Sequence, residues 1–376
     1  MTKVSTLIKH KEGWLIIKNL IINKHDELTM KNIRASIIKL LVVSITCIIS
    51  NYAFAHHSFV SHYDPSRSVE LTGVVTKFSF RNPHAFVFLD AENEQGEMKS
   101  WEVELHSKAV LSRMGLNQSN LKAGDTITAT VWPNREEGNP LVFGIGLVIA
   151  DGTKIGEHPE LVAKESVYLT ETGAARAQGR WRSPLVRTKD RISPLPLNEA
   201  GISARESYSA EKSPANDCEI INLPTIYHVP YLFDIRISDD SILLAYEIFG
   251  INRRIPIGDT YEQSEETGML GVARARIEGD EIVIESKDYP ESDWGIAQAG
   301  DYNGRGADVP SSPAKTLVER LSVSDDGMTL NIAYELGDSA YLSEVYSNTA
   351  IGERVSDDET IYPFECDIES ASRFTQ

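Results

Sequence analysis

Positive charge is scarce in this sequence of 376 residues. Its 37 Lys and Arg are outnumbered by 55 Asp and Glu, which gives a formal net charge of −18 at pH 7. Nucleic acids and anionic lipids are bound largely through clustered Lys and Arg, whose contacts release counterions. Because an excess of carboxylates repels such partners, the composition excludes nucleic acid as a partner.

Recognisable catalytic motifs are also missing. The sequence has no Gly-x-Ser-x-Gly nucleophile elbow, no glycine-rich phosphate loop and no His-Glu-x-x-His zinc motif. Pairs of carboxylates are abundant, but a chain with 55 acidic residues has such pairs by chance. The sequence therefore predicts no reaction, and we expect a protein that is not an enzyme.

A leader for export stands out near the start of the chain. Residues 30–55 begin with three basic side chains, continue with an apolar stretch from Leu40 to Ile45, and end with Ala53-Phe54-Ala55. This order, with an apolar core too short to span a bilayer, is typical of a secretory signal peptide. We expect cleavage between Ala55 and His56, a periplasmic or secreted location in a bacterium, and a mature chain without a membrane span.

The surroundings of this leader leave two alternatives open. Met30 is the expected start of the protein, and residues 1–29 are a predicted upstream extension; if they are genuine, an uncleaved membrane anchor is the alternative. Cys47 would be a lipid attachment site only after a Leu-x-small-small pattern, which the residues before it lack. Residues 1–55 are therefore left out of the predicted fold.

Cleavage would leave 321 residues with 29 basic and 52 acidic side chains. That length exceeds one typical domain of roughly 100–200 residues, so we expect two domains. Two cysteines remain, Cys218 and Cys366, and in an oxidising compartment we expect them to form one disulfide. A pair of thiolate metal ligands is the alternative, although no close Cys-x-x-Cys spacing supports it.

Residues 56–155 have the pattern of a small β-barrel with one helix. Polar and apolar residues alternate between Val69 and Leu89 around a turn at Asn82-Pro83, and a third strand follows. A helical segment then has Ser107 as its N-cap and Gly115 as its stop, and two more strands complete the domain. This order predicts an OB-like barrel of five strands.

This first domain also contains six short motifs, which are Ala55-His56-His57-Ser58-Phe59, Tyr63-Asp64, Leu71-Thr72-Gly73-Val74-Val75, Asn82-Pro83-His84, Trp101-Glu102-Val103-Glu104 and Leu121-Lys122-Ala123-Gly124-Asp125. Together they cover about residues 55–155, and they resemble a family of secreted bacterial proteins classed only as a domain of unknown function. The resemblance implies export and supports the fold. It implies no activity.

The histidines of this domain form a candidate metal site. After cleavage, His56 would offer its α-amine and an imidazole nitrogen to one ion, and His84 is our candidate for a third nitrogen. His57 and His62 are alternatives, and the set resembles the copper site called a histidine brace. Such nitrogens suit copper(II) and zinc, and the order of affinities favours copper. The alternative is a mobile N-terminal arm and a His84 that only satisfies its turn.

Other candidate ligands have simpler explanations. We expect His106 to bond to the start of the helix, and His158 and His228 to lie in loops near prolines. The acidic run at residues 90–97 offers oxygens for calcium but lacks the spacing of a calcium loop, so we predict a solvated hairpin turn.

Residues 156–217 show no β-alternation, and we predict a linker with little regular structure and one short helix at 198–209. Its basic cluster is expected to contact the acidic face of the second domain, with an anionic ligand as the alternative; the members are Arg180, Arg182, Arg187, Lys189 and Arg191.

Residues 218–376 predict a series of hairpins. Turns rich in Gly and Asp at Asp239-Asp240, Gly279-Asp280 and Asp325-Asp326-Gly327 are each flanked by alternating residues. Eight or more antiparallel strands of this kind predict an up-and-down barrel or meander, closed by the disulfide, whose interior can hold a small apolar ligand. A packed interior without a ligand is the alternative.

Three further motifs, Tyr246-Glu247, Glu278-Gly279-Asp280 and Val318-Glu319-Arg320, resemble β-rich regions of other uncharacterised secreted bacterial proteins. A histidine often precedes the Glu-Gly-Asp hairpin in that pattern, whereas residues 268–271 of this chain are Gly-Met-Leu-Gly. The resemblance therefore carries no site over to this hairpin.

These observations favour a non-catalytic binding protein, periplasmic or secreted, with a small apolar ligand in the second barrel. A copper-binding protein or copper-dependent oxidase that uses His56 and His84 is the alternative. A third hypothesis is a structural role as a partner in an envelope complex, for which the sequence contains no specific motif.

Overall fold

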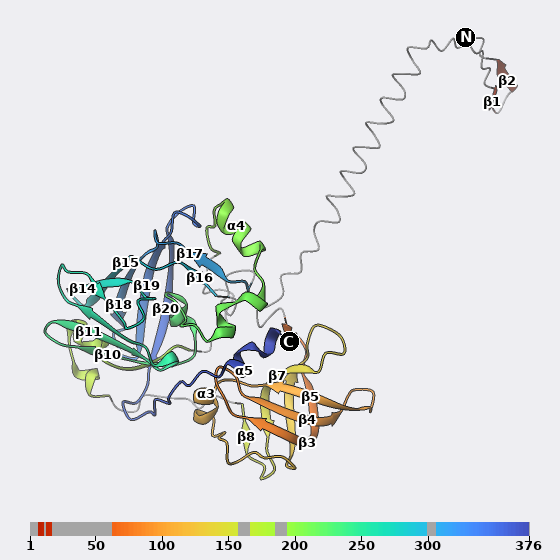
Figure 1. The fold of residues 1–376 in the computed structure, drawn as a ribbon, viewed down its shortest axis with the longest axis horizontal. Helices are drawn as coiled ribbons and strands as arrows, with labels where there is room; N and C mark the ends of the chain where they lie inside the picture. The colour runs from red at the N-terminus through yellow and green to blue at the C-terminus, as the bar shows by residue number, and fades with distance from the viewer. Residues whose placement is uncertain are drawn as a thin grey trace. The chain divides into compact units, whose positions relative to one another are not determined.

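The fold is seen in a computed structural model (Figure 1) that describes residues 7–10, 13–16, 62–156, 166–184, 194–298 and 306–375. The chain divides into two compact units, residues 1–54 and 55–376. In the first unit, β1 (Leu7–His10) and β2 (Gly13–Ile16) pair as an antiparallel hairpin. The second unit holds two β-barrels. Among the described helices, none has the length and apolar character needed to cross a membrane.

The first barrel, barrel 1, is a closed sheet of five strands with one helix. Its elements in chain order are β3 (Val69–Ser79), β4 (Phe86–Glu92), β5 (Met98–Glu104), α3 (Lys108–Arg113), β6 (Thr126–Trp132) and β7 (Leu141–Val148), and the short β8 (Lys154–Ile155) pairs antiparallel with the end of β7. The sheet order is β5-β4-β3-β6-β7, and a parallel pairing of β5 with β7 closes it. The predicted OB-like barrel is confirmed.

The helix of barrel 1 has the predicted ends. The Ser107 hydroxyl accepts from the Val110 N–H at 3.4 Å, which satisfies one of the free donors of the first turn. Gly115 follows the helix with a φ of +88°, a backbone conformation that favours glycine. The helix buries Ala109, Val110 and Leu111.

The second barrel, barrel 2, is an antiparallel sheet of ten strands. They are β9 (Gly179–Arg182), β10 (Leu232–Ile237), β11 (Ser241–Tyr246), β12 (Asn252–Pro256), β13 (Glu262–Gln263), β14 (Val272–Glu278), β15 (Glu281–Lys287), β18 (Thr316–Val323), β19 (Thr329–Gly337) and β20 (Tyr346–Arg354). Neighbouring strands follow chain order, and β20 pairs back onto β9. Arg254 N of β12 donates to the carbonyl of Ser264, the residue after β13, at 2.7 Å, and Ile257 after β12 forms a β-bridge with Ala275 of β14. The two edges of the sheet therefore meet, as in an up-and-down barrel.

The three predicted hairpins are present as β10–β11, β14–β15 and β18–β19. A separate hairpin pairs β16 (Ser292–Ala297) with β17 (Val309–Ser311). The helical elements are α4 (Glu199–Glu206), α5 (Ile368–Ala371) and the 3-10 turns η1 (Val167–Thr170), η2 (Gly173–Ala177), η3 (Ala210–Lys212), η4 (Pro214–Asp217), η5 (Thr225–His228), η6 (Ile248–Gly250) and η7 (Ser372–Thr375).

The predicted linker differs from the structure in one respect. Its helix is observed as α4, but β9 lies in the sheet of barrel 2, so this domain begins before Cys218. β9 has four residues and one apolar side chain, Trp181, so no alternation reveals it. Arg180 and Arg182 flank Trp181 and pair with Asp234 at 2.7 Å and Glu353 at 2.6 Å, as expected of the basic cluster. The cluster's other three members lie outside the described residues.

A buried ion pair lies in the interior of barrel 2. The side chains of Arg253 and Glu319 are both 0% exposed, and two hydrogen bonds of 2.7 and 2.9 Å join them. Tyr227 donates to Glu319 at 2.5 Å, and Arg253 also donates to Ser286 at 2.7 Å. These bonds offset the large cost of removing two charges from water. The pair links β12, which carries Arg253, to β18, which carries Glu319.

Removing one partner of this pair should be strongly destabilising. We expect Glu319→Gln to lower the free energy of unfolding by about 3–5 kcal/mol, because it leaves the Arg253 charge buried without its counterion. Urea titration of the oxidised protein measures the change. The matched control is Glu94→Gln, whose partner Arg67 is exposed, and the expected change there is within about 1 kcal/mol. Equal midpoints for both variants would contradict the prediction.

A second prediction concerns the acid stability of barrel 2. His228 Nε2 lies 3.0 Å from the Tyr334 hydroxyl, and burial lowers the pKa of His228 to about 4. An unfolded histidine is protonated below about pH 6.5, so between these values the unfolded state binds more protons than the folded state. Stability should therefore fall as the pH drops from 6.5 to 4. In His228→Gln this part of the slope should vanish in urea titrations across that range; an unchanged slope would refute the assignment.

Candidate functional site

The candidate site lies at one end of barrel 1. β5 ends here at Glu104, which pairs with Phe143 of β7, and Phe143 also pairs with Trp132 at the end of β6. The loop between β3 and β4 carries Asn82-Pro83-His84, and the Asn82-Pro83 peptide is cis. Tyr63, ahead of the first strand, forms a β-bridge with Asn134 in the loop after β6. The barrel thus gathers segments that are far apart in the sequence.

Glu104 is the buried centre of this end of the barrel. It is the last residue of β5, and its side chain is 2% exposed. One carboxylate oxygen accepts from the Tyr63 hydroxyl, and the other lies 2.8 Å from His84 Nδ1. Burial and the neighbouring Glu104 charge raise the pKa of Tyr63 far above its usual value, so Tyr63 stays a phenol donor. The buried carboxylate therefore has a donor on each oxygen, as its desolvation requires.

The imidazole of His84 has a defined orientation. Its Nδ1 lies 2.8 Å from a Glu104 oxygen and 3.1 Å from the Leu105 carbonyl oxygen. Both are acceptors, so Nδ1 carries the proton, and in the neutral ring Nε2 carries the lone pair. The His84 side chain is 34% exposed, whereas Glu104 is buried. Metal-binding histidines usually donate their second ring nitrogen to a carboxylate or carbonyl in this way.

An aromatic cluster borders the site. Tyr63 and Trp132 contact the Phe143 ring at centroid distances of 5.7 and 5.9 Å. His106 meets the same ring edge-on at 5.3 Å, and His62 lies 6.0 Å from Tyr63. The site end of the barrel thus combines imidazoles with an apolar wall.

The described contacts at the start of α3 come from Asn82 and Ser107. The Lys108 N–H at the start of α3 donates to the Asn82 side chain at 3.0 Å, and Ser107 caps the Val110 N–H. His106 instead packs against Phe143, while its carbonyl accepts from the Ala85 N–H at 3.2 Å. Asn82, in the loop before β4, thus makes a bond to the helix start of the kind that we expected from His106.

The structure places only part of the predicted ligand set. His84 is held as described, whereas His56, His57, the predicted cleavage position after Ala55 and His158 lie outside the described residues. Among the described residues, no three His, Cys, Asp or Glu side chains come together in a way that could hold a metal ion. A site with His84 therefore needs ligands from the rest of the chain. The acidic run at 90–97 forms the turn between β4 and β5, as predicted.

Sequence reasoning missed Glu104 and Tyr63. Side chains alternate between the two faces of β5. Val103 and Leu105 therefore lie on one face, and Glu104 lies on the other, which we predicted to meet solvent. It is buried because Tyr63 covers that face, through a hydrogen bond between residues 41 positions apart. The available signal was the pair of motifs Tyr63-Asp64 and Trp101-Glu102-Val103-Glu104, which contain both residues.

The interior of barrel 2, the predicted ligand site, is filled by side chains over the described residues. Trp181, Phe233 and Tyr246 lie in one buried apolar cluster with Ile226 and Tyr227 of η5. One surface hollow of about 360 Å³ lies at the junction of β12 and β13, and another of about 250 Å³ lies over exposed side chains of β18, β19 and β20. Neither hollow is an interior chamber.

Lys315, the residue before β18, is a fully buried base. Burial lowers the pKa of Lys315 to about 7. Its Nζ donates to Asn222 Oδ1 at 2.8 Å, to the Leu223 carbonyl at 2.7 Å and to the Gly295 carbonyl at 2.5 Å. Three acceptors match the three donors of an ammonium group, so Lys315 has a structural role that links the η5 segment to the β16–β17 hairpin.

Comparison with known proteins adds one match. Residues 44–141 match the model of a family described as "Family of unknown function (DUF6152)", in agreement with the resemblance inferred from the motifs. Neither the curated proteins nor the solved structures gave a match. Residues 44–141, which run from the predicted leader to the first residue of β7, are thus similar to a family without an assigned function.

Proposed function

We propose that this protein is an exported copper-binding protein whose site lies at the end of barrel 1, with His84 as one ligand. The observation that carries the proposal is the bond from His84 Nδ1 to the buried Glu104, 2.8 Å long. It fixes the tautomer, directs the lone pair to Nε2 and makes the ring a stronger ligand. A partly exposed imidazole supported in this way is suited to metal binding.

The remaining ligands are proposed from the sequence. Cleavage after Ala55 would make His56 the first residue, whose α-amine and imidazole chelate one ion and complete three nitrogens with His84. His57 and His62 are the alternatives to His84 as the third nitrogen. Neutral nitrogen ligands favour copper(II) over other common divalent ions. Copper is therefore the ion that we propose, and zinc is its competitor.

Export is part of the same proposal. The leader at residues 30–55 supports it, and the family match from residue 44 includes the cleavage position. The disulfide between Cys218 and Cys366 also supports it, because such bonds persist mainly in oxidising compartments. We propose a periplasmic or secreted location.

The other functional hypotheses stay predictions. One is a small apolar ligand in barrel 2, whose described interior holds a cluster of buried apolar side chains. An oxidase would need a substrate surface, and no described feature indicates one. A structural partner in an envelope complex has support only from the acidic composition.

The proposal predicts which changes weaken copper binding. A chain that starts at His56 should bind one copper(II) ion, and His84→Ala should weaken binding by at least about 100-fold, because it removes one of three ligands. One extra residue before His56 should weaken binding similarly, because the amine becomes an amide. Isothermal titration calorimetry with a competing chelator measures the affinities, and electron paramagnetic resonance reports the nitrogen ligands.

The matched control for this titration is His158→Ala, which removes a histidine that the sequence places outside barrel 1. It should leave the copper affinity unchanged. Equal copper uptake by the chain from His56, the extended chain and His84→Ala would refute the copper site.

Glu104 should tune the affinity without binding the ion. A glutamine at this position has one acceptor oxygen, so it cannot satisfy both the Tyr63 hydroxyl and His84 Nδ1. We expect Glu104→Gln to weaken copper binding by about 10–100-fold, the usual effect of losing a supporting partner. Glu92→Gln, an exposed carboxylate at the far end of β4, is the control. An unchanged affinity in Glu104→Gln would show that the carboxylate does not orient the ring.

A further inference from the structure

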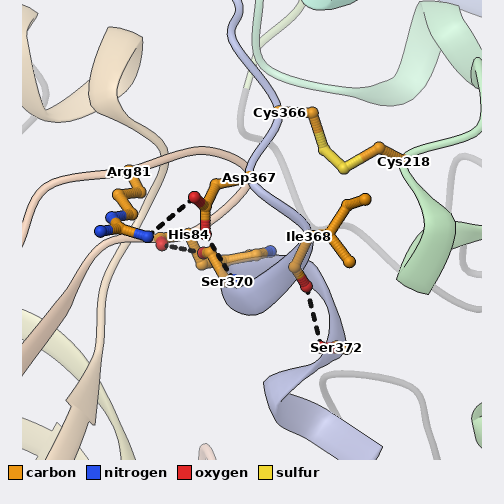
Figure 2. The surroundings of a disulfide bond; sticks show 8 residues. All are labelled: Arg81, His84, Cys218, Cys366, Asp367, Ile368, Ser370 and Ser372. Atoms are coloured by element: carbon orange, nitrogen blue, oxygen red, sulfur yellow. Dashed lines mark hydrogen bonds and ion pairs between the residues drawn. A yellow bond between two sulfur atoms is a disulfide. The ribbon is translucent and has the colours of Figure 1, made fainter.

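The C-terminal strap, defined as residues 365–373, lies against the loop that carries His84. Figure 2 shows the Cys218–Cys366 bond beside this contact, with Asp367 and Ser370 turned toward Arg81 and His84. The bond joins the strap to η4 of barrel 2, and it closes a span of 148 residues. The strap therefore connects the disulfide directly to the candidate site.

Two hydrogen bonds from the strap hold the backbone of the His84 loop. The Asp367 N–H donates to the Asn82 carbonyl at 2.8 Å, and the Ser370 hydroxyl donates to the His84 carbonyl at 2.6 Å. Asn82 is 0% exposed. The carbonyls of Asn82 and His84, the residues before and after Pro83, thus both accept from the strap.

Charges of opposite sign reinforce this contact. Arg81 NH1 lies 2.8 Å from an Asp367 oxygen and 3.4 Å from a Glu369 oxygen. At the far end of the strap, Arg373 lies 3.6 Å from Glu102 and 4.8 Å from the centre of the Phe88 ring. These pairs are partly exposed, so each is weak alone and all are screened by salt. The strap stays in place because several weak contacts act together with one covalent anchor.

The chain just before the strap has an anchor of its own. The buried Glu247 accepts from Arg113 of α3 and, at 2.8 Å, from the Tyr362 N–H. This anchor does not depend on the disulfide, so opening the bond would free the strap locally and leave the two barrels tethered. A local change of this kind alters the position of a ligand more than the stability of the whole fold.

We infer that the C-terminal strap is a redox-sensitive clamp, in which the Cys218–Cys366 disulfide keeps Asp367 and Ser370 on the His84 loop as positioning residues. This inference rests on the proposed function for its consequence, which is control of copper affinity. A dithiol reductant would supply two electrons and two protons, so that the sulfur–sulfur bond becomes two thiols and the reductant becomes a disulfide. Both cysteines are half-buried rather than fully buried, so a reductant has access to them.

The first test uses metal-free protein, so its result does not depend on copper. Hydrogen–deuterium exchange is measured for the peptide that covers residues 80–88 in the full-length oxidised protein and in Cys218→Ser/Cys366→Ser. We expect about tenfold faster exchange in the double variant, which corresponds to the net worth of one or two hydrogen bonds. Ser370→Ala, with the disulfide intact, should accelerate exchange in the same direction by a smaller factor.

The control is Ser372→Ala, two residues further along the strap. Its hydroxyl donates to the Ile368 carbonyl within the strap at 2.8 Å, so exchange at residues 80–88 should not change. A second readout is the tautomer of His84 from nitrogen–proton correlation spectra. The oxidised protein should show the Nδ1–H form, and both Ser370→Ala and the double variant should show a mixture.

The copper readout then tests the consequence. We expect the double variant to bind copper(II) about tenfold more weakly than the oxidised protein, since it loses support behind a ligand. If the oxidised protein binds no copper, the proposed function fails. The hydrogen–deuterium exchange at residues 80–88 and the tautomer of His84 still show whether the strap acts as a clamp. If a folded double variant and Ser370→Ala both match the oxidised protein in exchange and tautomer, the clamp is overturned. If the double variant does not fold, the comparison of Ser370→Ala with Ser372→Ala decides the question. Faster exchange at residues 80–88 in Ser370→Ala alone supports the clamp, and equal exchange in both variants overturns it.

Discussion

The hydrogen-bonding requirement of one buried carboxylate organises the candidate site. Glu104 is 2% exposed, and a charge at that depth costs several kcal/mol unless donors meet both oxygens. Tyr63 and His84 provide those donors from two different segments of the chain. The same contact decides which nitrogen of His84 carries the proton. The orientation of the imidazole is therefore a consequence of satisfying the barrel's own buried charge.

Barrel 2 meets the same requirement without forming a site at its surface. Arg253 and Glu319 satisfy each other in an interior that aromatic and aliphatic side chains fill. Three acceptors likewise surround the buried Lys315. A packed barrel of this kind is a firm anchor for Cys218, and through Cys366 for the strap that contacts the His84 loop. In the proposal, barrel 1 carries the ligand and barrel 2 holds the support behind it.

The parts of the fold that depend on local signals were predictable. The hairpins of barrel 2 have Gly and Asp turns between alternating strands, and α3 has its cap at Ser107 and its stop at Gly115. The order of elements then predicted the OB-like barrel. β9 was missed because its four residues have no alternation to detect. The disulfide was predicted by elimination, since two cysteines remained after the leader.

The sequence by itself determined a mainly β fold with a small first barrel and one cysteine pair, and it predicted a leader and His84 as a candidate ligand, because turns, alternation and residue counts are local properties. Only the tertiary structure decided that Glu104 is buried and that the strap reaches the His84 loop. The hydrogen bond from Ser370 to His84 joins residues 286 positions apart. Contacts over such a span depend on how the strands close and pack, and no short stretch of sequence encodes that closure.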